Sequence, residues 1–141
     1  MEAASAGAAS VDGLAIGVIA PALFNDRGGA NPHVSEIIEA GTLPIRLGTL
    51  LERADGAIAL PGSIGTATEL LLAWNHNHIV RRNGGTRLPI TAVGESWARI
   101  AAILTATGAE TGDVHLAESV VNGLNWLLQQ PEIRVEDHES L

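Results

Sequence analysis

The sequence predicts an α/β fold, a Rossmann-like three-layer arrangement with a parallel sheet. Short apolar runs typical of buried strands alternate with longer segments of helical spacing, which indicates βαβ units. Apolar residues make up 46% of the 141 residues and the mean hydropathy is +0.22, so a packed core is expected. No apolar run approaches about 18 residues, which argues against a membrane-spanning helix.

Each element is predicted from an apolar run and the turn residues that end it. An Ala-rich helix is expected over 2–10, ended by Gly13, and "LAIGVIA" (14–20) is expected to be a buried strand. Residues 21–33 should form a loop, because Pro, Asn, Asp and paired Gly favour turns. Further helices are expected over 34–40, 44–54, 66–82, 96–108 and 120–130, and further strands over 56–61, 88–94 and 114–118.

These elements are expected to form one domain over residues 1–130, followed at 131–141 by a short strand and an acidic C-terminal tail. The helix over 44–54 has apolar residues at helical spacing, which predict its buried stripe: Leu43, Leu47, Leu50 and Ala54. Arg46 lies beside this stripe, and the helix taken alone predicts an exposed arginine. Three residues at helix positions are expected in the core or at a dimer contact: Trp74, Trp97 and Trp126.

Charge and composition narrow the function classes. The net charge is −8 without a basic patch, which argues against a nucleic-acid partner. The chain has no cysteine and no signal-peptide pattern at its start, which fits a cytoplasmic protein without disulfides or thiolate metal sites. All eight basic residues are arginine, so a Walker P-loop and a pyridoxal phosphate Schiff base both lack their lysine. His76 and His78 point to different faces of a predicted helix, so no metal site is expected.

The stretch "LPGSIGTATEL" (60–70) joins a predicted strand to a predicted helix and has two interpretations. In the first, Thr66 and Glu69 form a capping box, in which the hydroxyl accepts from an amide of the first turn and the carboxylate reaches back to the cap amide. The glycines would then supply turn geometry only.

In the second interpretation the same turn binds a phosphate. Gly62 and Gly65 let the backbone approach a ligand, and the amides of Ser63, Gly65 and Thr66 converge at the positive end of the helix. Glu69, one turn into the helix, would face the sugar attached to that phosphate. The two interpretations compete for the same carboxylate.

The spacing from Arg46 through "ERADGAIALPG" to "GTATE" resembles the Lonely Guy family, long described as lysine decarboxylases. That family shows an arginine, then Ala-Asp, then a strand that ends in Pro-Gly-Gly-x-Gly-Thr-x-x-Glu. The positions of this chain that match the pattern are Arg46, Ala54, Asp55, Pro61, Gly62, Gly65, Thr66 and Glu69.

The resemblance implies a Rossmann-like homodimer that hydrolyses the N-glycosidic bond of nucleoside 5′-monophosphates to free base and ribose 5-phosphate. It implies that the Gly-rich turn, with Gly62, Ser63, Gly65 and Thr66, holds the 5′-phosphate. Arg46 and Glu69 would then be the catalytic residues. The expected partner is a small nucleotide such as a nucleoside monophosphate, with no metal and no cofactor.

The chain departs from the family pattern at four positions. Ser63 replaces the second glycine, Leu47 a lysine, Leu43 a methionine and Thr68 a glutamate. These departures are typical of more distant members, which are called nucleotide-binding or likened to molybdenum-cofactor carriers. The alternative function is therefore a non-catalytic binder or carrier of a nucleotide or nucleotide cofactor.

The start of the chain resembles the second helix and third strand of the family. The fold is therefore expected to be N-terminally incomplete relative to the family, lacking the strand, helix and strand that precede them in relatives. We expect an upstream coding segment that supplies these elements; the alternatives are a sheet that is rearranged or one that is completed by a partner.

Overall fold

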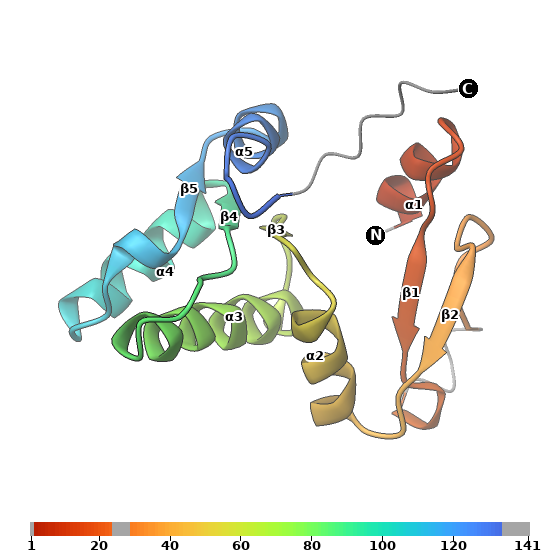
Figure 1. Ribbon diagram of the computed structural model, residues 1–141, viewed down its shortest axis with the longest axis horizontal. Coiled ribbons are helices and arrows are strands. Elements are labelled where there is room, and N and C mark those ends of the chain that lie inside the picture. The colour runs from red at the N-terminus through yellow and green to blue at the C-terminus, as the bar shows by residue number, and fades with distance from the viewer. Residues whose placement is uncertain (1, 24–28, 134–141) are drawn as a thin grey trace. The chain divides into compact units, whose positions relative to one another are not determined.

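The computed structural model describes residues 2–23 and 29–133 (Figure 1). The chain divides into two compact units, Met1–Arg53 and Ala54–Leu141. Of the C-terminal strand and tail expected over 131–141, residues 131–133 form a turn and the rest lies outside the described residues.

The N-terminal unit is built on two parallel strands. Strand β1 pairs with β2 so that Ile16 lies opposite Glu36 and Ile19 lies opposite Glu39. Helix α2 contacts β1. In chain order the elements are α1 (Glu2–Ala9), β1 (Ile16–Ile19), the 3-10 helix η1 (Pro21–Leu23), β2 (Glu36–Glu39) and α2 (Leu43–Glu52).

The helix predicted over 34–40 is wrong, because its centre is strand β2. The β-branched pair Ile37–Ile38 favours an extended backbone, and pairing with β1 supplies the hydrogen bonds that such a backbone needs.

The stripe predicted for α2 is less buried than expected. Leu47 and Leu50 are half-buried, Leu43 is 40% exposed, and Ala54 lies beyond the end of the helix. Within its unit α2 packs on a single strand of a two-stranded sheet, which offers too little surface to bury a full helix face.

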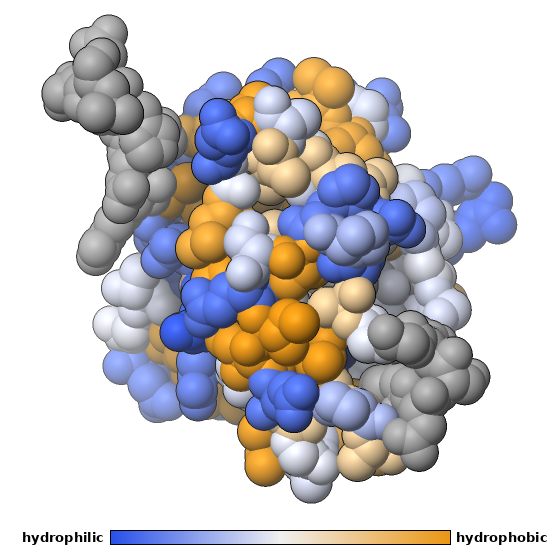
Figure 2. Space-filling model, turned by 90° about the vertical axis from the view of Figure 1, so that its right-hand side faces the viewer, coloured by the Kyte–Doolittle hydropathy of each residue, from blue (hydrophilic) through white to orange (hydrophobic). Residues whose placement is uncertain are grey.

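Apolar side chains also reach the surface of the N-terminal unit. Figure 2 shows hydrophobic residues at the surface, beside hydrophilic ones. Among the described residues of this unit, the large apolar side chains that are at least 40% exposed are Val11, Leu14, Ile16, Leu23, Ile37, Leu43 and Ile45. A sheet of two strands is too narrow to bury both of its faces.

The C-terminal unit contains a three-stranded parallel sheet in the order β3–β4–β5. Its elements are β3 (Ala57–Ala59), α3 (Ile64–Arg82), β4 (Ile90–Val93), α4 (Glu95–Ala106), the 3-10 helix η2 (Thr111–Asp113), β5 (His115–Ala117) and α5 (Val120–Leu127). The alternation of parallel strands and helices confirms the predicted Rossmann-like α/β fold.

Strand β4 is the centre of this unit, with all four of its residues buried. Helix α5 packs on the face that bears Thr91 and Val93, where Gly123 comes so close that a Cβ there would lie 3.0 Å from the Thr91 hydroxyl. Figure 1 shows α3 and α4 on the opposite side of β4. The unit therefore has three layers, and Trp74 and Trp97 lie in its core, with 6% and 3% of their surface exposed.

A buried polar network holds the amino-terminal edge of this sheet. The side chain of Asn77, on α3, accepts a hydrogen bond from the Leu88 amide (2.8 Å) and donates to the Leu88 carbonyl (2.7 Å) and the Asp113 carbonyl (3.2 Å). Asn77 is 1% exposed, so these bonds are made away from water. One amide side chain thus ties α3 to the segments that enter β4 and β5.

Ion pairs extend this network to the surface. The buried carboxylate of Asp113 lies 3.3 Å from Arg87 Nη1 and 3.5 Å from Arg81 Nε. Arg81 also donates a hydrogen bond to Glu110, which lowers the pKa of the Glu110 carboxyl and raises that of Arg81. The part that Glu110 contributes to stability is therefore present above its unfolded pKa and lost as the pH falls through the lower folded value.

We expect Asn77→Ala to lower the free energy of unfolding by about 2–3 kcal/mol, because it leaves the Leu88 amide and carbonyl without their partner. Asn75→Ala, at an exposed position of the same helix, is the matched control and should change stability by less than about 0.5 kcal/mol. Urea denaturation of both variants measures the difference. Equal losses would show that the Asn77 bonds add nothing net to stability.

Candidate functional site

The glycine-rich turn lies at the carboxyl end of β3, between Ala59 and the start of α3 at Ile64. In a parallel sheet this is the edge at which ligands bind. Pro61, Gly62 and Ser63 are exposed, and Thr66 is half-buried. The turn is therefore open to a ligand.

The predicted capping box is wrong, because α3 begins earlier than expected. Ser63 is the N-cap, with the extended backbone of a cap residue (φ −98°, ψ −160°). Thr66 is then the third helical residue, and Glu69 lies in the second turn, too far along to reach the cap amide. Ser63 and Thr66 are both cap-forming residue types three positions apart, so the pattern alone could not decide between them.

Gly62 is required by a close contact inside the turn. A Cβ at this position would overlap the Thr66 hydroxyl and lie 2.8 Å from the Thr66 Cβ. Gly65 is different, because a Cβ there would meet nothing within 4 Å. Packing against Thr66 therefore explains why a glycine is needed at position 62, whereas the space over Gly65 is open.

The start of α3 has amides that the helix itself cannot satisfy. The first intrahelical bond there runs from the Ala67 amide to the Ser63 carbonyl (3.0 Å). The amides of Ile64, Gly65 and Thr66 precede it and have no intrahelical acceptor. They lie at the positive end of a 19-residue helix, which favours an anion in front of them.

Glu69 lies on the same side of α3 as the open part of the turn. It follows Gly65 by four residues and Thr66 by three, which places all three on one helix face. The Glu69 side chain is half-buried, next to the buried Leu70. The Glu69 carboxylate therefore lies on the same helix face as Gly65 and Thr66.

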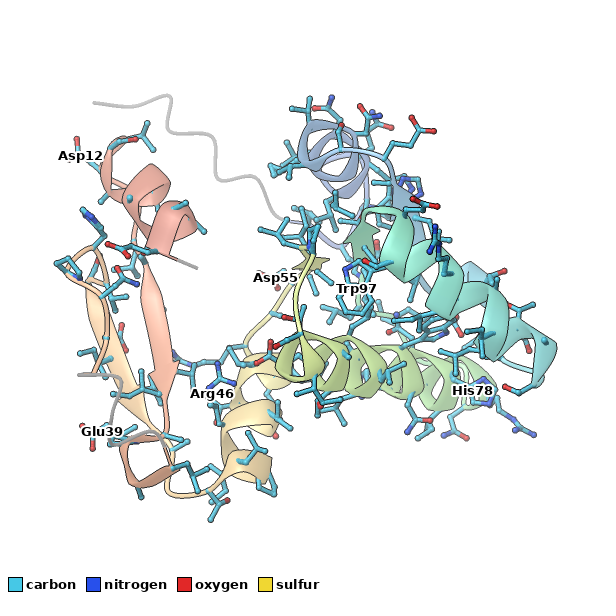
Figure 3. All side chains as sticks on the ribbon, turned by 180° about the vertical axis from the view of Figure 1, so that it is seen from behind. Asp12, Glu39, Arg46, Asp55, His78 and Trp97 are labelled. Atoms are coloured by element: carbon cyan, nitrogen blue, oxygen red, sulfur yellow. The ribbon has the colours of Figure 1, made fainter. Side chains whose placement is uncertain are left out.

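The Arg46 side chain makes a hydrogen bond to the backbone and is half-buried, so the interpretation as an exposed arginine is wrong. Its Nε donates a hydrogen bond to the Val18 carbonyl at 2.9 Å, and the residue is half-buried. The carbonyls of Ala15 and Ile19 accept hydrogen bonds from residues in or next to β2. Because successive carbonyls of a strand point to opposite edges, the Val18 carbonyl points to the other edge of β1. Figure 3 shows Arg46 extending from α2 toward β1.

Of the six predicted site residues, the structure brings five together in the C-terminal unit: Gly62, Ser63, Gly65, Thr66 and Glu69. Arg46 belongs to the N-terminal unit, where its Nε bond fixes the plane of the guanidinium.

Sequence reasoning missed the contribution of α4 to this edge. Gly94 follows β4 directly with a φ of +108°, which a residue with a Cβ rarely adopts. Its amide donates to the Ala117 carbonyl (2.9 Å), and a Cβ there would lie 3.3 Å from the Pro61 ring. A glycine at the end of the strand predicted over 88–94, just before the predicted helix, was the available signal.

No three His, Asp or Glu side chains of residues 2–23 and 29–133 are grouped in a way that could hold a metal ion. Within the same residues, no helix is both long and apolar enough to cross a membrane.

A protein-family model described as "possible lysine decarboxylase" matches residues 1–120. The chain belongs to this family. The match includes all the predicted site residues, and it confirms the resemblance to the Lonely Guy or lysine decarboxylase-like superfamily. No curated protein matches the chain.

We expect Gly62→Ala and Gly65→Ala to differ in stability. Gly62→Ala forces a methyl group into Thr66 and should lower the free energy of unfolding by about 1–3 kcal/mol. Gly65→Ala adds a methyl group in open space within a helix and should be neutral or stabilising by up to about 1 kcal/mol. Thermal and urea denaturation test this pair, and a Gly62→Ala variant as stable as the parent would contradict the packing described for the turn.

Proposed function

We propose that the protein binds a small nucleotide through its phosphate at the turn formed by Gly62, Ser63, Gly65 and Thr66. The observation that carries this proposal is the start of α3, whose first amides lack intrahelical acceptors and adjoin open space over Gly65. Membership of the family supports it.

The activity that we propose is hydrolysis of the N-glycosidic bond of a nucleoside 5′-monophosphate. Cleavage of this bond develops positive charge on the ribose ring, as in glycoside hydrolysis. A carboxylate held on the phosphate-binding helix, Glu69, is suited to stabilise that charge and to orient the attacking water. The products would be the free base and ribose 5-phosphate.

Arg46 supplies the positive charge in this proposal. A guanidinium stays protonated, so it stabilises negative charge on the phosphate or the departing base but does not donate a proton. The Val18 bond uses one of its five N–H donors and sets the direction of the others. Orientation before the reaction is what an electrostatic role requires.

The decarboxylase activity in the family description fits this chain poorly. Decarboxylation with pyridoxal phosphate needs a lysine for the Schiff base, and the 141 residues contain none. We therefore do not propose that activity.

A non-catalytic binder is the second candidate, and one observation favours it. Thr68 replaces the glutamate that precedes the motif glutamate in relatives, and its hydroxyl donates to the Ile64 carbonyl at 2.8 Å. The chain thus has one carboxylate where the family pattern has two.

One experiment separates the two candidates. The chain is incubated with AMP and other nucleoside monophosphates, and released base and the shift in melting temperature are measured on the same samples. Release of base supports the hydrolase, and a shift without release supports the binder. If neither base release nor a shift in melting temperature is observed, both candidates are contradicted.

We expect Glu69→Gln to reduce base release by at least about a hundredfold, because the amide carries no charge to stabilise the ribose cation. The shift in melting temperature with AMP should remain, since the phosphate is held by backbone amides. Glu52→Gln, at an exposed position of α2, is the control and should retain the parental rate. Normal turnover in Glu69→Gln would exclude the proposed role of this carboxylate.

We expect Arg46→Gln to reduce base release by at least about tenfold, because it removes the positive charge while keeping a planar polar group. Arg53→Gln, an exposed arginine just after α2, is the charge-matched control and should leave the rate unchanged. The rates of both variants are measured at one ionic strength, since a change in net charge alone alters the attraction of an anionic substrate. An equal loss in both would assign the effect to net charge.

A further inference from the structure

Trp97 connects α4 to the residue that precedes the glycine-rich turn. Its indole Nε1 donates a hydrogen bond to the Leu60 carbonyl at 3.1 Å, and the side chain is 3% exposed. Leu60 lies just beyond the last paired residue of β3, Ala59. Figure 3 labels Trp97 within the C-terminal unit.

The fold of α4 explains how the indole reaches this carbonyl. Trp97 is the third residue of α4, and helical side chains lean toward the N-terminus of their helix, here toward the carboxyl edge of the sheet. Gly94 allows α4 to begin directly after β4, and the Pro61 ring packs against that glycine. Two contacts from the start of α4 thus meet two successive residues, Leu60 and Pro61.

The segment that these contacts hold has few anchors of its own. Leu60 lies outside the β3–β4 register, and Pro61 has no amide hydrogen to donate. Gly62, which comes next, is the residue with the widest backbone freedom. The indole bond therefore fixes the carbonyl that directly precedes Pro61 and Gly62.

We propose that Trp97 is a positioning residue for the ligand-binding turn, and that it acts through Leu60 to hold the amides at the start of α3 in place. The inference rests on the proposed function for its ligand. In this proposal Trp97 orients the turn in addition to packing in the core.

The test compares Trp97→Phe with Trp74→Phe. Trp74 is 6% exposed and its Nε1 donates to the Glu110 carbonyl at 3.1 Å, so both variants remove one buried indole bond of equal length. The Trp74 bond lies at the other end of the unit, beside η2. Both variants lose similar packing, and only Trp97→Phe should disturb the turn.

Two readouts are measured on the full chain. The first is hydrogen exchange of the Ala67 amide, which bonds to the Ser63 carbonyl and reports opening of the first turn of α3. We expect it to exchange at least ~5-fold faster in Trp97→Phe, the effect of one lost hydrogen bond, and at the parental rate in Trp74→Phe. The second is the Kd for AMP, which should rise by a similar factor in Trp97→Phe alone.

Parental exchange at Ala67 in Trp97→Phe, or equal changes in both variants, would overturn the proposal. If Trp97→Phe does not fold, Trp97→Met, which fills much of the space with a flexible apolar side chain and has no donor, is measured with the same two readouts and the same criteria. If the parent binds no AMP, the proposed function fails, and exchange at Ala67 alone decides the role of Trp97.

Discussion

The architecture of the C-terminal unit depends on one buried strand, β4, which pairs in parallel with a neighbour on each side. Parallel pairing brings the carboxyl ends of all three strands to one edge, because each strand runs in the same direction. The helices that follow β3 and β4 must therefore both begin at that edge. The glycine-rich turn, the open amides of α3 and the first turn of α4 are neighbours for this reason. The direction of the strands alone thus places these segments at one edge of the sheet, whatever side chains they carry.

Much of this unit could be predicted from the sequence, because its signals are local. Buried strands are short apolar runs ended by glycine or proline, and the longer helices have regular apolar spacing. The motif from Pro61 to Glu69 gave the family and the position of the turn. The three-layer arrangement of the unit followed from the alternation of strands and helices.

The features that the sequence did not predict depend on contacts between distant residues or on a choice between equal local signals. The bond from Arg46 to the Val18 carbonyl spans 28 residues, and nothing near Arg46 indicates it. Strand β2 is a short β-branched segment whose form is decided by the strand beside it. The start of α3 depended on which of two cap-forming residues, Ser63 or Thr66, ends the turn. In each case tertiary contacts or the backbone path decided the outcome.

The polar network around Asn77 lies at the amino-terminal edge, away from the turn. The bonds of this network and the groups proposed to meet a ligand therefore lie at opposite edges of the sheet. A point substitution in the turn leaves the network intact, and a change in the network leaves the amides of α3 exposed as before. Because the two lie apart, substitutions in the turn can accumulate during evolution without unfolding the unit. The carboxyl-edge loop is free to diverge toward a new ligand, or to lose catalysis and keep binding, while the same folded unit is inherited.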